Sequence, residues 1–505
     1  MVEIFYRRLR LPWRGAFQRH PRTQPALGDA MTIEFPLVIN GQWREGSSKL
    51  SEDVLNPATG EVIGRVAHAT SVDLDEALDA AADGLVEWQA VVPWQRGGIL
   101  KNAADRLRSD IESIARTITK EQGKPIAEAK AEVIRSAEFL EWGGEQARRI
   151  ADRTLRGRDG RNRIEIETHP IGVVAAFTPW NFPMALAAKK FAGALGAGCS
   201  IICKPSEETP GSVLAMAKAL LAAGVPSKAV SIVFGNPAEI SDYLIPAPAV
   251  AKITFTGSIP VGKQLAAAAG RVMKPVTMEL GGHAPAIVCG DFDPERAADI
   301  LAKAKFANSG QICLSPTRFF VEESISKRFT ARMVEHAKAW RMGDGMDPDS
   351  QMGPLANERR VQAMERLVDD ARKRGATIAV GGQRVGNRGF FYAPTVMTNV
   401  PESAEILHSE PFGPIVPILP FADEPDMLRQ ANGLEFGLSA YLFTNDATRQ
   451  RRLKDALHFG TVGVNEFVTH LPEVPLGGWK ESGFGTEGGL EILAPYQKTK
   501  FVSVW

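Results

Sequence analysis

The sequence predicts an α/β fold made of two blocks, each built around a mostly parallel sheet. From about residue 171 to 282, short apolar runs such as IGVVAAF, SIICK and KITFTG alternate with helical segments. A second block, from about 283 to 484, repeats this alternation with runs such as FFVEES, PIVPILPF and SAYLFT. Single strands that alternate with helices are typical of parallel sheets joined by crossover helices.

The residues before the first block predict a strand-rich start followed by helices. TIEFPLVINGQWREG, residues 32–46, alternates apolar and polar side chains around Asn40-Gly41, which is typical of a β-hairpin. Ser71 is placed to cap a helix in which apolar residues recur at helical spacing. Two more helical stretches are expected near 94–120 and 125–150.

The composition is that of an ordinary globular protein and excludes several kinds of partner. The chain has 505 residues, with 59 basic and 59 acidic side chains and therefore no net charge. A neutral chain has no electrostatic reason to bind nucleic acid, and no apolar run is long enough for a membrane helix. Four cysteines without a CxxC pair predict a reducing compartment, no disulfide scaffold and no structural metal site.

The first thirty residues differ from the rest of the chain. They carry six arginines and two acidic residues, and they lack the apolar segment of a secretory signal. We interpret residues 1–30 as a basic, disordered extension, or as the result of a start codon assigned ahead of Met31. The expected location is cytoplasmic, and it is mitochondrial only if this arginine-rich stretch is a transit peptide.

One cysteine has a setting that favours reactivity. Cys313 occurs in FANSGQICLSPT, after a polar stretch and ahead of Pro316. A free cysteine is most often a buried packing residue, but a thiol on a polar, flexible loop can act as a nucleophile. Asn181 in TPWNFP could donate to an oxyanion, and Glu279 in MELGGH could serve as a base. Each also has a plain interpretation, as a turn residue and as a solvated strand-end charge.

Two motifs at predicted strand ends indicate a nucleotide site. FTGSIPVGK places Gly257 and Ser258 where N–H groups at a helix start can bind a pyrophosphate. CKPSEETP places Lys204 and Glu207 where ribose hydroxyls could be held, although Ser206 and the following acids could instead form a helix cap. Ligands of open parallel sheets bind at the carboxyl ends of the strands, where both motifs are expected.

Six motifs, taken in order, resemble those of the NAD(P)-dependent aldehyde dehydrogenase superfamily. They are TPWNFP, KPSEETP, FTGSIPVGK, MELGGH, FANSGQIC and EPFGP. The resemblance covers about residues 35–505, and PLGGWKESGFGTEGG is similar to bacterial NAD-dependent succinate-semialdehyde dehydrogenase-like enzymes. It implies that Cys313 attacks the aldehyde to give a thiohemiacetal and then a thioester. It also implies that Asn181 stabilises the oxyanion and that Glu279 activates the hydrolytic water.

The resemblance further implies a dinucleotide site. The residues that match are Pro179 and Trp180 beside the dinucleotide, Lys204 and Glu207 at the adenosine ribose, Gly257 and Ser258 at the pyrophosphate, and Glu410 and Phe412 at the nicotinamide ribose. We expect NAD rather than NADP, because a carboxylate such as Glu207 accepts the ribose 2′-hydroxyl and repels a 2′-phosphate.

The substrate positions depart from the pattern of this subgroup. Succinate-semialdehyde dehydrogenases hold the substrate carboxylate with two arginines, and the matching positions here are Lys189 and Ala307. The candidate substrate residues are Lys189, Phe467, His470 and Leu471, for a semialdehyde or, alternatively, for a wider range of aliphatic or aromatic aldehydes. The general-base glutamate disfavours a CoA-acylating enzyme, and the intact catalytic set disfavours a binding protein without turnover.

The resemblance also implies a domain plan. Residues 31–150 and 171–282 are expected to form a Rossmann-type dinucleotide-binding domain, and residues 283–484 an α/β catalytic domain. Residues 151–170 and 485–505 are expected to form a β-strand oligomerisation arm, since the terminal KTKFVSVW alternates like an edge strand. The expected assembly is a homodimer or homotetramer that acts on a small-molecule aldehyde.

Overall fold

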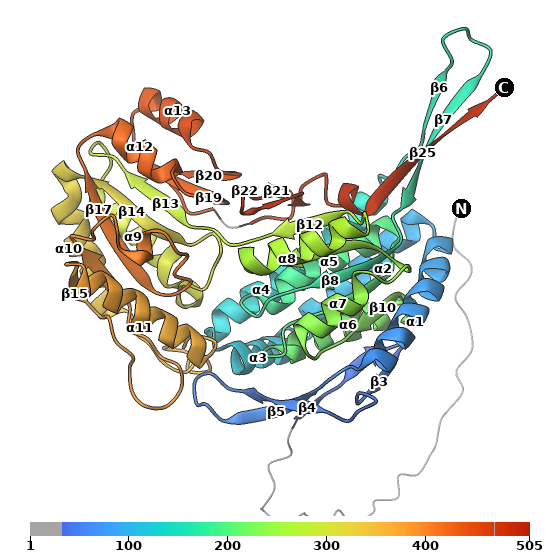
Figure 1. Cartoon of the computed structure of the whole chain (residues 1–505), viewed down its shortest axis with the longest axis horizontal. Helices are drawn as coiled ribbons and strands as arrows, with labels where there is room; N and C mark the ends of the chain where they lie inside the picture. The colour runs from blue at the N-terminus through green and yellow to red at the C-terminus, as the bar shows by residue number, and fades with distance from the viewer. Residues whose placement is uncertain (1–32, 469) are drawn as a thin grey trace, which may run out of the picture. The chain divides into compact units, whose positions relative to one another are not determined.

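The structure is a computed structural model that describes residues 33–468 and 470–505. The predicted basic extension, residues 1–30, lies outside the described residues. The described chain forms two large α/β blocks and a three-stranded arm (Figure 1). The predicted α/β class is confirmed, because both large sheets are mostly parallel and their strands are connected through helices.

The first block contains an eight-stranded sheet of order β23-β12-β11-β8-β9-β10-β2-β3. Neighbouring strands from β12 to β10 are parallel, whereas β23, β2 and β3 pair antiparallel. The strands are β2 (Leu37–Ile39), β3 (Gln42–Arg44), β8 (Val173–Phe177), β9 (Ile201–Lys204), β10 (Val230–Ile232), β11 (Val250–Thr256), β12 (Val276–Glu279) and β23 (Gly483–Phe484). The predicted hairpin at Asn40-Gly41 is therefore present as β2 and β3.

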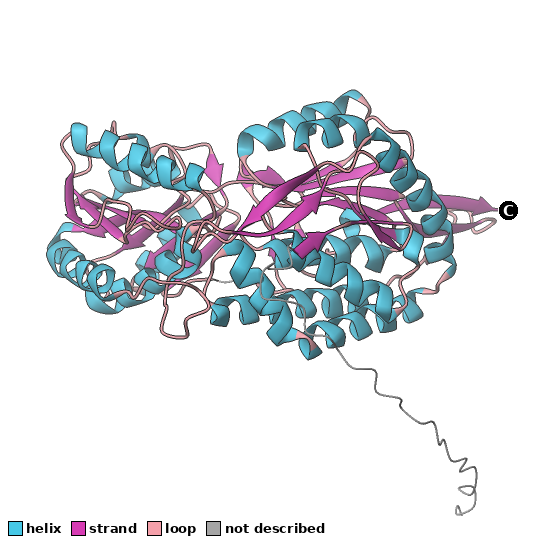
Figure 2. Ribbon diagram, turned by 90° about the horizontal axis from the view of Figure 1, so that it is seen from below, coloured by secondary structure: helices cyan, strands magenta, loops and turns pink. Residues whose placement is uncertain are grey.

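Helices cover both faces of each large sheet (Figure 2). In the first block, β8 is buried along its whole length, as expected for a central parallel strand. The helices of this block are α1 (Ser71–Ala90), α2 (Pro93–Ser109), α3 (Ile111–Gln122), α4 (Ile126–Ala147), α5 (Pro183–Ala197), α6 (Pro210–Ala223), α7 (Pro237–Leu244) and α8 (Ile259–Arg271). Of these, α5 is buried along its whole length and packs against α4.

The second block contains a seven-stranded sheet of order β15-β16-β17-β14-β13-β19-β20, in which only β15 is antiparallel to its neighbour. Its strands are β13 (Ala284–Val288), β14 (Pro316–Glu322), β15 (Thr377–Val380), β16 (Thr395–Thr398), β17 (Ile415–Phe421), β19 (Ser439–Phe443) and β20 (Thr461–Val464). Its helices are α9 (Pro294–Phe306), α10 (Glu323–Ala339), α11 (Glu358–Lys373), α12 (Glu424–Asn432) and α13 (Ala447–Ala456).

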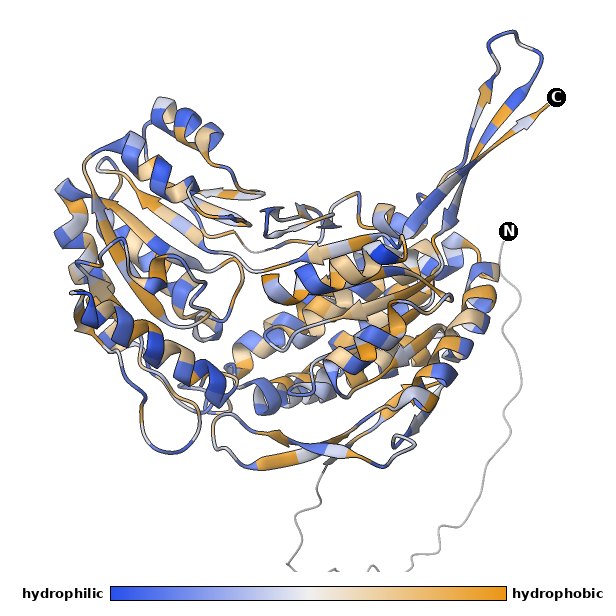
Figure 3. Cartoon of the chain, viewed as in Figure 1, coloured by the Kyte–Doolittle hydropathy of each residue, from blue (hydrophilic) through white to orange (hydrophobic). Residues whose placement is uncertain are grey.

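The distribution of hydrophobic residues explains these layers. Hydrophobic residues colour much of the strands of both sheets, and hydrophilic residues colour much of the outer helices (Figure 3). Apolar side chains of the strands are removed from water only when helices cover both faces of the sheet. Among the described helices, none has both the length and the apolar character needed to cross a membrane.

Three local predictions need correction. The cap of α1 is Thr70 rather than Ser71, because Thr70 and Asp73 form a capping box. The helical stretch expected over 94–120 is two helices that meet at Asp110. Ser206 does not begin a helix, since α6 starts at Pro210 after Thr209. In the first case the neighbouring residue, Thr70, takes the capping position.

The arm is a three-stranded antiparallel sheet of β6 (Arg153–Arg156), β7 (Arg163–Pro170) and β25 (Gln497–Val504), and it projects from the first block (Figure 1). β25 pairs with β7 and leaves its other edge open among the described residues. Phe501 on β25 is 71% exposed. The shorter strands are β1 (Ile33–Phe35), β4 (Ser51–Leu55), β5 (Val62–Ala67), β18 (Phe436–Gly437), β21 (Pro475–Leu476), β22 (Trp479–Lys480) and β24 (Glu487–Gly488).

Candidate active site

Four parallel strands of the first sheet end at one edge, and a polar group lies at or just after each end. In the register of β8, β9 and β11, Phe177 is opposite both Lys204 and Phe255. In the next pair, Thr256 is opposite Glu279. The residues that this edge brings together are Asn181, Lys204, Gly257, Ser258 and Glu279.

The loop that carries Cys313 leaves α9 through a left-handed turn. Asn308, Ser309 and Gly310 have φ angles of 46°, 55° and 72°. The side chains of Asn308, Ser309 and Gln311 are buried, so this polar stretch is not exposed to solvent, although Cys313 itself is partly exposed. The polar residues are buried here because they bond to protein groups rather than to water.

Hydrogen bonds from several elements hold this turn in place. The Asn308 amide donates to the Asn181 carbonyl at 2.9 Å, and its side-chain oxygen accepts from Gln122 at 2.9 Å. The Asn308 N–H donates to Glu128 Oε2 at 2.9 Å. Asn181 Nδ2 donates to the Gln311 carbonyl at 3.0 Å. A side-chain amide has two N–H donors, so Asn181 keeps a second hydrogen for another acceptor beside the Cys313 loop.

Cys313 is half-buried and lines a cavity of about 320 Å³. The cavity wall is mostly apolar and also contains the Lys189 side chain. Burial raises the pKa of the Cys313 thiol to about 12, and the Lys189 ammonium opposes this shift. The other cysteines, Cys199, Cys203 and Cys289, are buried. Cys313 is thus the only one of the four with an accessible thiol.

Glu279 ends β12 as a buried carboxylate. Its Oε1 atom has no hydrogen-bond partner among the described residues. Burial, together with the nearby Glu487 charge, raises the Glu279 pKa well above its usual value. A raised pKa makes the deprotonated carboxylate a stronger base, and its free oxygen can take a proton from a water molecule. The plain interpretation of Glu279 as a solvated charge is wrong.

Gly282 explains how the two blocks meet at Cys313. A Cβ atom on Gly282 would lie 2.6 Å from the Cys313 carbonyl oxygen, closer than real atoms approach. The connection from β12 to β13 can therefore pass the Cys313 loop only with glycine at this position. This close passage lies three residues after Glu279, and the Glu279 charge contributes to the raised pKa of Cys313.

An ion pair behind Glu279 was not foreseen from the sequence. Lys190 Nζ lies 2.6 Å from Glu487 Oε1, and both side chains are buried. The lysine pair in AAKK and the glutamate in GTEGG stand almost 300 positions apart, and neither forms part of a catalytic motif by spacing. The two buried charges are visible only once α5 and β24 lie side by side.

The predicted cofactor residues occupy two regions. At the adenosine end, Lys204 Nζ lies 2.6 Å from Glu207 Oε1. At the other end, Glu410 Oε1 accepts the Gly282 N–H at 3.1 Å. Phe412 packs edge-on against Trp180, with ring centroids 5.5 Å apart, and Pro179 precedes Trp180 after β8.

The residues between these regions fit a dinucleotide. Ser258 is the N-cap of the 13-residue helix α8 but makes no side-chain cap bond. The first-turn N–H groups of α8 thus remain able to donate to a pyrophosphate that lies at the helix start. Gly257 precedes this cap and carries no side chain that could cover it. No cluster of His, Cys, Asp and Glu within residues 33–468 and 470–505 has the arrangement of a metal site.

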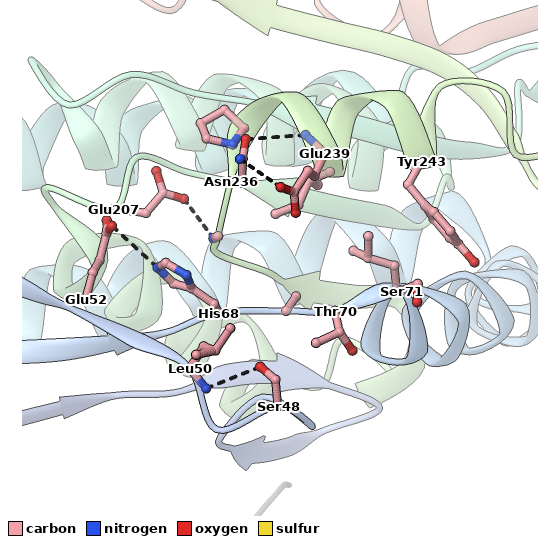
Figure 4. Close-up of a pocket in the computed structure, with 15 residues that line it drawn as sticks. Ser48, Leu50, Glu52, His68, Thr70, Ser71, Glu207, Asn236, Glu239 and Tyr243 are labelled. Atoms are coloured by element: carbon pink, nitrogen blue, oxygen red, sulfur yellow. Dashed lines mark hydrogen bonds and ion pairs between the residues drawn. The ribbon is translucent and has the colours of Figure 1, made fainter.

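A larger cavity, of about 770 Å³, lies beside Glu207 (Figure 4). Its lining comes from β4 and the residues just before it, from the segment that follows β5 and the start of α1, from Glu207 after β9, and from α7 and its N-cap. These residues include Glu52, His68, Thr70, Glu207, Asn236 and Glu239. No sequence motif indicated that the N-terminal strands reach this position.

Three of the four predicted substrate residues line the 320 Å³ cavity with Cys313: Lys189, Phe467 and His470. Leu471 does not line it and is 45% exposed, whereas Val468 and Leu476 do line it. Wall residues that the sequence did not single out are Phe139, Phe182, Leu186, Ile312, Leu314 and Arg135. They come from α4, α5 and the Cys313 loop, which no linear motif connects.

Comparisons with known proteins agree with this geometry. The model of the aldehyde dehydrogenase family matches residues 43–502. The 4-(hydroxymethyl)benzenesulfonate dehydrogenase TsaD1 of Comamonas testosteroni is 42% identical over 92% of this chain and 97% of its own. The NADP-linked succinate-semialdehyde dehydrogenase GabD of Escherichia coli is 37% identical over 95% of this chain and 99% of its own. The crystal structure of succinate-semialdehyde dehydrogenase from Burkholderia pseudomallei has a TM-score of 0.92 at 38% identity, and covers 94% of this chain and 99% of its own.

Proposed function

Since the chain belongs to the aldehyde dehydrogenase family, we propose that it oxidises an aldehyde with a distal anionic group to the carboxylic acid, with NAD as cofactor. The observation that carries the substrate class is Lys189. Its side chain is buried in the wall of the Cys313 cavity, and its ammonium lies over the Phe139 ring at 5.3 Å. Lys189 forms no ion pair in the part of the chain that the structure describes. The Glu487 and Glu279 charges raise its pKa, but burial outweighs them.

A buried cation without a paired anion is costly, and burial lowers the Lys189 pKa. A carboxylate or sulfonate on the substrate would supply the missing partner. Two of the relatives are named for compounds that contain such a group. TsaD1 is named for a benzenesulfonate, and GabD is named for succinate semialdehyde. The apolar wall, with Phe139, Phe182 and Phe467, suits an aromatic or alkyl body between the aldehyde and the anion.

In the proposed reaction, Cys313 is the nucleophile and attacks the aldehyde carbon to form a thiohemiacetal. The oxygen that gains negative charge is stabilised by the second Asn181 hydrogen and by the Cys313 N–H. One such donor contributes about 3–4 kcal/mol to the lowering of the barrier. When bound, NAD would accept a hydride from this adduct.

Glu279 completes the reaction by hydrolysis. Its unpartnered Oε1 removes a proton from water, which attacks the Cys313 thioester and releases the carboxylic acid. This role disfavours CoA as the acyl acceptor. The residues that would hold the cofactor are Lys204 and Glu207 at the adenosine ribose, the start of α8 at the pyrophosphate, and Glu410 and Phe412 at the nicotinamide ribose. Glu207 supports the choice of NAD.

A second candidate is a dehydrogenase for uncharged aldehydes, which the apolar wall favours. An activity assay separates the two. NADH formation would be measured with succinate semialdehyde, 4-formylbenzoate, 4-formylbenzenesulfonate, benzaldehyde and butanal. The proposal expects kcat/KM for an anionic aldehyde to exceed that of its uncharged analogue by about tenfold or more, as for one charge-assisted bond. Equal or better use of benzaldehyde and butanal would contradict the proposed substrate class.

A further inference from the structure

We propose that Glu52 is a second residue that selects NAD against NADP, by extending the negative wall that begins at Glu207. This inference rests on the proposed function, since it places the adenosine ribose at Lys204 and Glu207. Glu52 belongs to β4, in the N-terminal strands, and no sequence motif connects it with the cofactor.

The geometry comes from the 770 Å³ cavity beside Glu207. Glu52 and His68 enter this cavity from the N-terminal strands, and Glu207 enters it from the end of β9 (Figure 4). Glu52 Oε2 lies 3.5 Å from His68 Nε2, and both residues line the cavity. Two carboxylates from different parts of the chain therefore border one opening, next to the position proposed for the ribose.

The two carboxylates also affect each other electrostatically. Burial and the Glu207 charge both raise the Glu52 pKa, whereas His68, Lys204 and Arg359 lower it. A cavity that already resists a second negative charge would resist the two charges of a 2′-phosphate still more. A ribose 2′-hydroxyl carries no charge and can donate a hydrogen bond to a carboxylate.

The two permanently charged groups that lower the Glu52 pKa each contact a carboxylate already. Lys204 Nζ lies 2.6 Å from Glu207, and Arg359 lies 2.5 Å from Glu208. A 2′-phosphate would have to compete for these cations with carboxylates already in place. The surroundings of Glu52 thus add repulsion without offering an unpaired positive charge.

The test uses the full-length protein and two fragments of the cofactors, adenosine 5′-monophosphate and adenosine 2′,5′-bisphosphate. Their dissociation constants are measured by calorimetry, without aldehyde or turnover. The variant is Glu52→Gln, with Glu52→Ser as a second variant. The matched control is Asp53→Asn, which changes the same charge on the neighbouring residue of β4. Asp53 does not line the cavity, and it faces Arg65 at 3.3 Å.

The wild-type protein should bind the monophosphate more tightly than the bisphosphate. Glu52→Gln should tighten binding of the bisphosphate by about fivefold and leave the monophosphate within about twofold, as expected for a half-exposed charge. Asp53→Asn should change neither constant. The gain in Glu52→Gln should shrink at high salt, because salt screens exposed charges.

Three results would overturn the inference. The first is an unchanged bisphosphate constant in both Glu52 variants, and the second is an equal gain in Asp53→Asn. In either case the wild type still binds the monophosphate and NAD, so the proposed function would stand. The third is a wild-type protein that binds neither fragment nor NAD, which would remove the cofactor site and the inference together.

Discussion

Lys190 Nζ and Glu487 Oε1 lie 2.6 Å apart in the interior of the protein, where both side chains are buried. Lys190 also donates to Thr254 Oγ1 at 3.2 Å. This bond network joins α5, β11 and the segment near the C-terminus behind the candidate base Glu279. The charges of both Lys190 and Glu487 act on Glu279, in opposite directions.

Glu487→Gln should shift the pH dependence of activity. The Glu487 charge raises the Glu279 pKa, and the Lys190 charge lowers it. Glu487→Gln removes the charge that raises the Glu279 pKa and leaves the Lys190 charge that lowers it, so the Glu279 pKa should fall. A base acts in its deprotonated form, and the acidic limb of the kcat profile should therefore move to lower pH.

The measurement is kcat against pH for the wild type and Glu487→Gln, together with thermal unfolding. Breaking one partner of a buried ion pair costs about 3–5 kcal/mol, so a lower Tm is also expected. Lys101→Met, which removes an exposed lysine paired with Glu141, is the control and should change neither quantity. An acidic limb that moves to higher pH in Glu487→Gln would contradict this account.

Cys313→Ala should abolish NADH formation, because no other described cysteine has an accessible thiol. Cys289→Ala is the matched control, since Cys289 is buried in the core of the second block. The control should retain kcat and lose about 1 kcal/mol of stability through the small cavity it leaves. Activity is measured as NADH absorbance with the best aldehyde of the panel. Full activity in Cys313→Ala would rule out the proposed nucleophile.

Lys189→Met should weaken the use of anionic aldehydes only. Loss of one charge-assisted bond raises KM for such a substrate by about tenfold to a hundredfold. Benzaldehyde should keep its KM, because its ring contacts only the apolar wall. Lys189→Arg keeps the charge and should restore much of the anion preference. Steady-state KM values for paired charged and uncharged substrates test this, and equal losses for both would contradict the anchoring role.

Asn308 should matter for turnover through the position of the Cys313 loop. Asn308→Ala removes the bonds to Asn181 and Gln122 and places alanine at a φ of 46°, at a cost of about 1–3 kcal/mol. Asn308→Gly loses the same bonds but tolerates the backbone. We therefore expect kcat to fall in both variants and Tm to fall further in Asn308→Ala. Equal Tm values for the two variants would show that backbone strain is unimportant here.

The open edge of β25 should be an interface between copies of the chain. Phe501 and Trp505 are 71% and 86% exposed, and such exposed apolar side chains on an open strand favour pairing with another subunit. Phe501→Glu should reduce the mass measured by light scattering after size-exclusion chromatography. A control is Val86→Glu, which changes an exposed apolar residue of α1, outside the arm. A wild type that is already monomeric would contradict the predicted assembly.

The α/β class, the places of most strands and the family could be predicted from the sequence. Strands such as β8 could be predicted because the sequence around Val173–Phe177 is a short, uninterrupted apolar run. Such a run is typical of a strand that is covered on both faces of its sheet. The motifs around Asn181, Glu279 and Cys313 were recognisable because each is a short run of neighbouring residues. Helix boundaries such as Thr70 were missed by one residue, since adjacent residues offer similar capping groups.

The residues that surround these motifs come from distant parts of the chain, and they could be identified only in the folded structure. The Lys190–Glu487 pair, the bond between Asn308 and Glu128, and the meeting of Glu52 with Glu207 each join positions far apart in the chain. Burial and pKa depend on everything packed around a group, and no local pattern encodes that packing. The charge of Glu279 could thus be read from the sequence, but its burial and raised pKa required the assembled fold.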